Sequence, residues 1–164
     1  MKNKILALLM ASIIVLIVPV TVFAESDTST LTGSVGATMT ISSPETITLP
    51  SMVPGSTVES TSQYVTISTN TSGWSLIVSE NSGSNDGKME KSGGITMTYP
   101  VYVKGGELSN YTSLTSPVTL KNATGGPCAN QNIEGIFFQQ QVAANEAPGT
   151  YSMTIIFTAN PGGY

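Results

Sequence analysis

The sequence predicts an all-β protein, folded as a single two-sheet sandwich of immunoglobulin-like or jelly-roll-like type with about eight or nine strands. Ser and Thr supply 41 of the 140 residues that follow position 24, and both residues disfavour helix interiors while Thr favours strands. Short stretches with apolar side chains at every second position recur along the chain, separated by Gly, Pro, Asn and Ser. After the first two dozen residues, no stretch has the apolar period of an amphipathic helix.

The clearest of these strands contains Trp74, the one tryptophan of the chain. Trp74, Leu76 and Val78 alternate with Ser, Ile and Ser, and this period of two indicates a strand with one face against a core. Because a buried aromatic side chain covers roughly 150–250 Å², we expect Trp74 to lie in the middle of that core. Residues 64–69 form a second alternating stretch, and the turn-forming residues 70–73 predict a hairpin between the two strands.

The other strands are less regular. A short strand between Pro44 and Pro50 is expected at a sheet edge, and Pro100 indicates an edge or a bulge within its strand. We expect Leu108, Tyr111 and Leu114 to anchor loops, and residues 122–131 to be irregular. The remaining predicted strands occupy residues 31–41, 45–49, 95–103, 117–120, 136–142 and 151–159.

Residues 1–24 are expected to be a cleaved signal peptide. Lys2 and Lys4 precede a long apolar run, and Ala24 ends a stretch that suits signal peptidase. An uncleaved membrane span is the alternative, because the apolar run is just long enough to cross a bilayer. Pro19 and Thr21 interrupt it before the cleavage site, which favours export.

The mature protein, residues 25–164, has a length that suits one domain. Residues 25–30 are expected to be a flexible segment at its N-terminus. It carries four lysines and ten carboxylates, a net charge of −6, and neither Arg nor His. A nucleic-acid binder needs a basic patch to neutralise phosphates, and anionic membrane surfaces also attract basic proteins. We therefore expect no nucleic-acid partner, no binding to such surfaces and no membrane span in the mature chain.

Catalytic and metal chemistry are also expected to be absent. Without His or Arg, and with one Cys, most acid–base, nucleophilic and zinc arrangements are unavailable, so we expect no enzyme, no cofactor and no metal. A carboxylate pair could still serve a glycosidase, but the candidates fall in or beside predicted loops, where charge is normally solvated: Glu80, Asp86, Glu90, Glu107 and Glu134.

Residues 82–87 have a faint similarity to a calcium-binding loop. Such a loop needs oxygen-rich side chains at its first and third positions and an acidic residue six positions after its glycine. Ser82, Ser84 and Gly93 stand at those three positions. A hairpin turn at Asp86-Gly87 is the preferred interpretation.

Cys128 has no second cysteine with which to form an intramolecular disulfide. We expect a small buried side chain in preference to an intermolecular bridge, which an unpaired cysteine of a secreted protein also permits. Glycosylation sequons begin at Asn70, Asn110 and Asn122, and they matter only if the source organism glycosylates its secreted proteins.

The tripeptide Trp74-Ser75-Leu76, entered through Asn70-Thr71-Ser72-Gly73, resembles the first W-x-L motif of the WxL-type surface proteins of Gram-positive bacteria. The similarity extends loosely over residues 31–159. It implies a secreted β-sandwich that attaches non-covalently to the cell wall, with Trp74 and Leu76 as candidate wall-binding or partner-binding residues. The second motif of that family would fall in the last strand, where this chain has Phe157-Thr158-Ala159.

Two other binding functions remain open. In a pilus-like filament, a donor strand would insert into the groove of a neighbouring subunit, and the apolar row suited to this is Leu31, Val35, Ala37, Met39 and Ile41. The alternative is that this strand pairs within its own domain, which we favour because it loses no association entropy. A carbohydrate-binding module would need exposed aromatic side chains, for which the candidates are Tyr64, Tyr99, Tyr102, Tyr111 and Tyr164.

The function expected from these observations is that of a secreted, non-catalytic cell-surface or adhesion protein. Its expected partners are a cell-wall polymer or other surface proteins, with self-assembly as the main alternative.

Mass spectrometry of the secreted protein tests the export prediction. Glu25 should be its first residue, because Ala24 ends the expected signal peptide. A secreted chain that still begins at Met1 would contradict the prediction.

Overall fold

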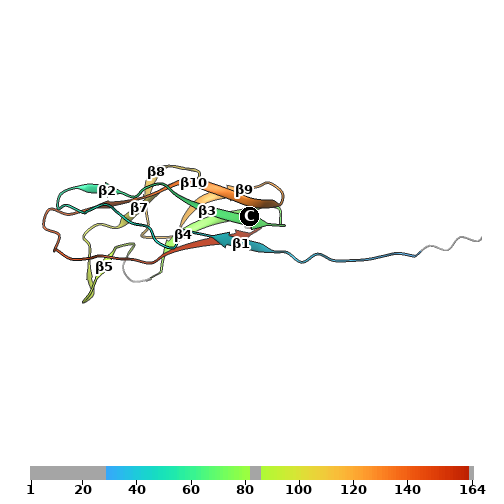
Figure 1. Cartoon of the computed structure of the whole chain (residues 1–164), viewed down its shortest axis with the longest axis horizontal. Coiled ribbons are helices and arrows are strands. Elements are labelled where there is room, and N and C mark those ends of the chain that lie inside the picture. The colour runs from blue at the N-terminus through green and yellow to red at the C-terminus, as the bar shows by residue number, and fades with distance from the viewer. Residues whose placement is uncertain (1–28, 82–85, 163–164) are drawn as a thin grey trace, which may run out of the picture. The chain divides into compact units, whose positions relative to one another are not determined.

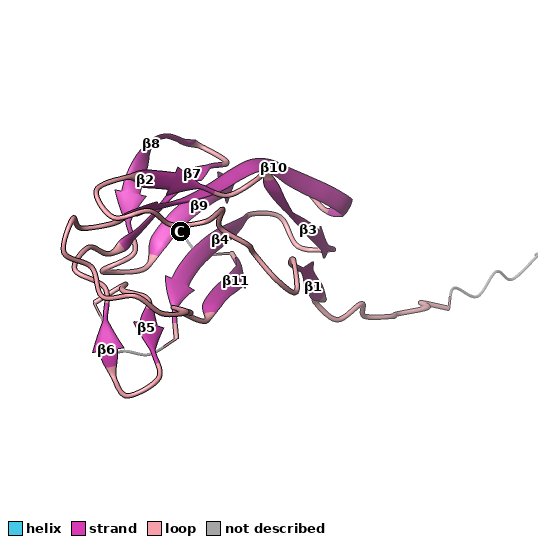
Figure 2. Cartoon of the chain, turned by 60° about the vertical axis from the view of Figure 1, so that its left-hand side comes forward, coloured by secondary structure: helices cyan, strands magenta, loops and turns pink. Residues whose placement is uncertain are grey.

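The computed structural model describes residues 29–81 and 86–162, and every regular element within those ranges is a β-strand (Figures 1 and 2). The prediction of an all-β protein is confirmed. The expected signal peptide at 1–24 lies outside the described residues. By its contacts the chain divides into two units, Met1–Val35 and Gly36–Tyr164, and all the strands belong to the second. No helix in the described part of the chain is long and apolar enough to cross a membrane.

Two antiparallel sheets hold most of the strands, and a short hairpin holds the other two. The first sheet has the order β1-β3-β10-β7-β8, with β2 also paired to β10. Its strands are β1 (Met39–Ser42), β2 (Thr57–Glu59), β3 (Gln63–Thr69), β7 (Val101–Gly105), β8 (Leu108–Ser113) and β10 (Cys128–Gln141). The second sheet has the order β11-β4-β9, with β4 (Trp74–Glu80), β9 (Val118–Ala123) and β11 (Ile155–Pro161). The hairpin pairs β5 (Glu90–Lys91) with β6 (Ile95–Thr96).

Both sheets contribute to one buried apolar cluster, which is compatible with a two-sheet sandwich. In Figure 2, β4 and β11 lie beside each other on one side of this cluster, with β3 and β10 on the other. Phe138 of β10 meets Phe157 of β11 edge to face, with ring centroids 6.3 Å apart, a favourable geometry for two aromatic rings. The first sheet supplies Val65, Ile67, Val101, Val103, Ile133, Ile136 and Phe138, and the second supplies Trp74, Leu76, Val78, Val118 and Leu120.

The predicted strands around Trp74 are confirmed as β3 and β4, but the predicted hairpin between them is wrong. β3 pairs with β1 and β10, whereas β4 pairs with β9 and β11. The turn after β3 therefore carries the chain from one sheet to the other. The physical reason is that both strands have an apolar face, and these faces bury more surface against each other across the core than they would side by side in one sheet.

Other boundaries also differ from the predictions. The stretch 31–41 is a strand only at Met39–Ser42, and residues 45–49 form no strand. The stretch 95–103 is interrupted because Pro100 has no backbone N–H, and β7 begins directly after it in the sheet interior rather than at an edge. Residues 108–113, predicted as loop, form β8, and β10 begins at Cys128 within the segment predicted to be irregular.

Replacing Trp74 by Ala should lower the free energy of unfolding by about 3–5 kcal/mol, the usual cost of removing a large aromatic side chain from a core. Trp74 is 1% exposed, which confirms the predicted core position. Urea titration followed by circular dichroism measures the change. Tyr64→Ala is the matched control, because Tyr64 lies on β3 and is 61% exposed. A loss below about 1 kcal/mol for Trp74→Ala would contradict a central role in the core.

Candidate functional site

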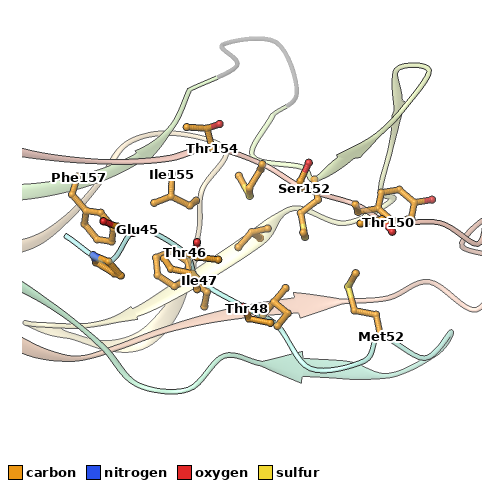
Figure 3. Close-up of a pocket in the computed structure, with 17 residues that line it drawn as sticks. Glu45, Thr46, Ile47, Thr48, Met52, Thr150, Ser152, Thr154, Ile155 and Phe157 are labelled. Atoms are coloured by element: carbon orange, nitrogen blue, oxygen red, sulfur yellow. The ribbon is translucent and has the colours of Figure 1, made fainter.

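One pocket formed by the described residues is a groove between two stretches of chain (Figure 3). Its volume is about 670 Å³. One wall is the segment 44–49 and the other is the segment 150–157. Ile155 and Phe157 point into the groove, whereas Thr154 points away from it (Figure 3).

The floor of the groove is part of the common core. Val101 of β7 and Phe138 of β10 line it from the first sheet. The facing side chains of β11 are only half-buried, whereas Trp74, Leu76 and Val78 of the neighbouring strand β4 are at most 1% exposed. Val101 and Phe138 are themselves buried, so the incompletely covered side chains beside the groove are those of β11.

The backbone of β11 is also open on this side. Its seven residues pair with β4 along one edge, and no second strand of the described residues hydrogen-bonds to β11, although β1 lies close to it. The nearby segment 45–49 has the alternating sequence of a strand, but no ladder joins it to β11. An unpaired, apolar strand edge is a template for another strand.

The groove was not predicted from the sequence, although residues 45–49, which form part of one wall, were predicted as a strand. Pro44 and Pro50 flank that segment, and we interpreted them as marks of an edge strand. The two prolines instead flank a stretch that pairs with no strand. No local sequence signal predicts the groove, because the groove depends on β3 and β4 belonging to different sheets.

The chain enters the folded unit through contacts with Asn70. The Asn70 side-chain amide donates a hydrogen bond to the Gly36 carbonyl at 2.8 Å and accepts one from the Thr38 N–H at 2.7 Å. The Asn70 N–H donates in turn to the Thr38 carbonyl. These three bonds fix the backbone at 36–38, directly before β1.

The residues predicted as a donor strand fall into two groups. Met39 and Ile41 belong to β1 and pair with Thr69 and Ile67 of β3, so this part pairs within its own domain. Leu31 is 100% exposed and Val35 is 91% exposed, and Ala37 is exposed as well. The described residues before β1, 29–38, form no strand. We call residues 29–38 the N-terminal arm.

The two residues of the W-x-L tripeptide lie inside the protein. Trp74 is 1% exposed and Leu76 is 0% exposed. A cell-wall polymer cannot reach either side chain in this fold. Cys128 is half-buried against the core, with its Sγ 3.7 Å from the Ile67 carbonyl oxygen.

Tyr111 belongs to a cluster of aromatic and charged side chains away from the groove. The Lys104 ammonium lies 4.6 Å from the Tyr111 ring centroid and 5.0 Å from that of Phe137. The Tyr111 hydroxyl donates a hydrogen bond to Glu59, and burial together with this carboxylate raises the pKa of Tyr111. Because Lys104 already covers one face of each ring, these rings offer a sugar little free surface. Among the other candidate tyrosines, Tyr64 and Tyr99 are exposed and Tyr102 is half-buried, and Tyr164 lies outside the described residues.

The candidate carboxylates lie apart from the groove or already have partners. Glu107 forms an ion pair of 2.8 Å with Lys121, and this hydrogen-bonded contact lowers the pKa of Glu107. Asp86 and Gly87 form a turn in which both residues have positive φ, while residues 82–85 of the calcium-like loop lie outside the described residues. Within the described part of the chain, no group of three or more His, Cys, Asp and Glu residues could hold a metal ion.

No protein-family model, curated protein or solved structure matches the chain.

Two deletions test the division of the N-terminal segment. Removing residues 25–35 should change the free energy of unfolding by less than about 0.5 kcal/mol, the usual effect of a change at an exposed surface. Removing residues 25–42 should cost at least about 2 kcal/mol, because it also removes β1 and the packing of Met39. Urea unfolding of the two proteins gives the comparison. A large loss from the shorter deletion would show that the arm packs on its own domain.

Proposed function

We propose that this chain is a secreted, non-catalytic structural or adhesion protein of the cell surface. It acts by binding to the cell wall or to other surface proteins, and its N-terminal arm is the binding element. The proposed scaffold is a two-sheet sandwich that presents the arm and the open edge of β11.

The observation that carries this proposal is the exposure of the arm. Leu31 and Val35 are 100% and 91% exposed, so neither stabilises its own domain. Both stand at odd positions, with Gly33 and Ala37 completing an apolar row, and Thr and Ser at most of the intervening positions. Such alternation suits a strand that pairs with another sheet, where the backbone supplies the affinity and alternate side chains fill pockets.

The charge of the protein supports the same function. The mature chain has a net charge of −6, yet residues 29–38 contain no charged side chain. An uncharged segment can enter an apolar site without the cost of burying an ionised group. It also avoids adding local repulsion between acidic surfaces.

A cell-wall partner is favoured by the resemblance of Trp74-Ser75-Leu76 to the WxL-type proteins. Because Trp74 and Leu76 are buried, their role in this proposal is to hold β4 in the core. Contact with the wall is assigned to exposed parts of the molecule instead.

Fractionation of cells that produce the protein tests the proposal. The full chain should remain with the cell-surface fraction, while a chain that lacks residues 29–35 but keeps its signal peptide should be released into the medium. The matched control replaces the same residues by a Gly/Ser segment of equal length, which keeps the spacing but removes Leu31 and Val35. Equal retention of all three proteins would overturn the role of the arm, and release of all three would overturn the surface location.

A further inference from the structure

The open edge of β11 has the form of a site that lacks one strand. The strand ladder stops at β11 on the side of the groove within the described residues. The side chains of β11 that face the core, Ile155, Phe157 and Ala159, are each only half-buried. A strand laid against this edge would satisfy the backbone of β11 and cover these side chains together.

The dimensions of the groove fit a single extended segment. Both walls are stretches of extended chain, and in Figure 3 Ile155 and Phe157 of one wall are directed into the space between them. Seven residues of β11 extend over about 23 Å, and the seven residues of the arm that precede Gly36 would extend over about the same length as a strand. The arm is therefore long enough to pair with the part of β11 that lines the groove, from Ile155 to Phe157.

The arm also matches the groove in chemistry. One face of its residues before Gly36 would present Leu31, Gly33 and Val35, and the other would present Thr and Ser hydroxyls. The first face suits the half-buried apolar side chains of Ile155 and Phe157. The absence of a side chain at Gly33 suits a groove that Phe157 and Ile47 already partly fill.

The end of the arm is fixed within the folded unit. Gly36 and Thr38 are held by bonds to Asn70. Directly after them, β1 pairs with β3 and the chain continues into the segment 44–49, which is itself a wall of the groove. The residues before Gly36 therefore remain as the segment that a second copy could bind.

We propose that the groove beside β11 binds the N-terminal arm of a second copy of this chain. Leu31 and Val35 of the incoming arm cover the half-buried side chains of Ile155 and Phe157, and its backbone pairs with the free edge of β11. Each copy then has one arm and one groove, which are different parts of the chain. Because a copy whose arm is bound still has a free groove, this head-to-tail contact can repeat, and it produces a ring or an open filament. This inference rests on the proposed role of the arm, and it names the partner as another copy.

Four point variants of the secreted chain test the pairing. Val35→Asp places a charge on the face of the arm that enters the groove, and Ile155→Lys places one in the groove. Ser34→Asp and Ile156→Lys are the matched controls, because each lies one residue away and on the opposite face of its strand. Ile156 is 37% exposed.

Light scattering over a range of protein concentrations, together with electron microscopy, gives the readout. The unchanged chain and both controls should form linear or ring-shaped assemblies. Val35→Asp and Ile155→Lys should raise the concentration required by about 100-fold or more, since each buries an unpaired charge.

A labelled peptide of residues 29–38 separates the remaining outcomes. It should bind the Val35→Asp chain, whose groove is intact, and bind Ile155→Lys at least about tenfold more weakly. If Ile155→Lys fails to fold, the Val35→Asp chain and its control still decide the question, because position 35 is exposed. An unchanged chain that stays monomeric at all concentrations overturns the proposal. Surface retention that persists in that case would leave the arm as a binding element for a different partner.

Discussion

The structure depends on the burial of one apolar strand face, that of β4. Trp74, Leu76 and Val78 fill the centre of the core, and each is at most 1% exposed. Because the chain has one Trp and one Cys, and so no intramolecular disulfide, this face must be covered from the opposite side by other strands. β3 and β10 provide that cover. This requirement also explains why the chain crosses from one sheet to the other directly after β3.

The strands of the second sheet differ in how completely their core-facing side chains are buried. β4 lies between β9 and β11 and is well covered, whereas β11 is at the edge and its core-facing side chains remain half-buried. Natural proteins usually protect such an edge with charges, prolines, bulges or a covering segment. Here the segment 44–49 lies opposite β11 but leaves a groove of about 670 Å³. An apolar edge that is left open is better explained as a binding site than as a defect of the fold.

The sequence predicted the parts of the fold that depend on local pattern. The all-β class and the strands around Trp74 follow from alternation, which is set by the strand geometry itself. The assignment of β3 and β4 to different sheets could not be predicted, because alternation is the same in a hairpin and in a crossover between sheets. The limits of β1 also could not be predicted from the sequence. Residues 31–41 alternate throughout, but only Met39–Ser42 pairs with β3. The alternating apolar pattern of the arm could be recognised in the sequence. The groove could not, because it is built from segments about 100 residues apart.

The central claim is that the arm of one copy lies beside β11 of another, and a disulfide trapping experiment measures this contact directly. In a Cys128→Ser background, one chain carries Val35→Cys and a second, distinguishable by an affinity tag, carries Ile155→Cys. Mild oxidation of the mixture should produce a covalent dimer that contains both chains. The pair Val35→Cys and Ile156→Cys, whose side chains would lie on opposite faces of the sheet, should give much less. Absence of the mixed dimer, or an equal yield from the two pairs, would contradict the claim.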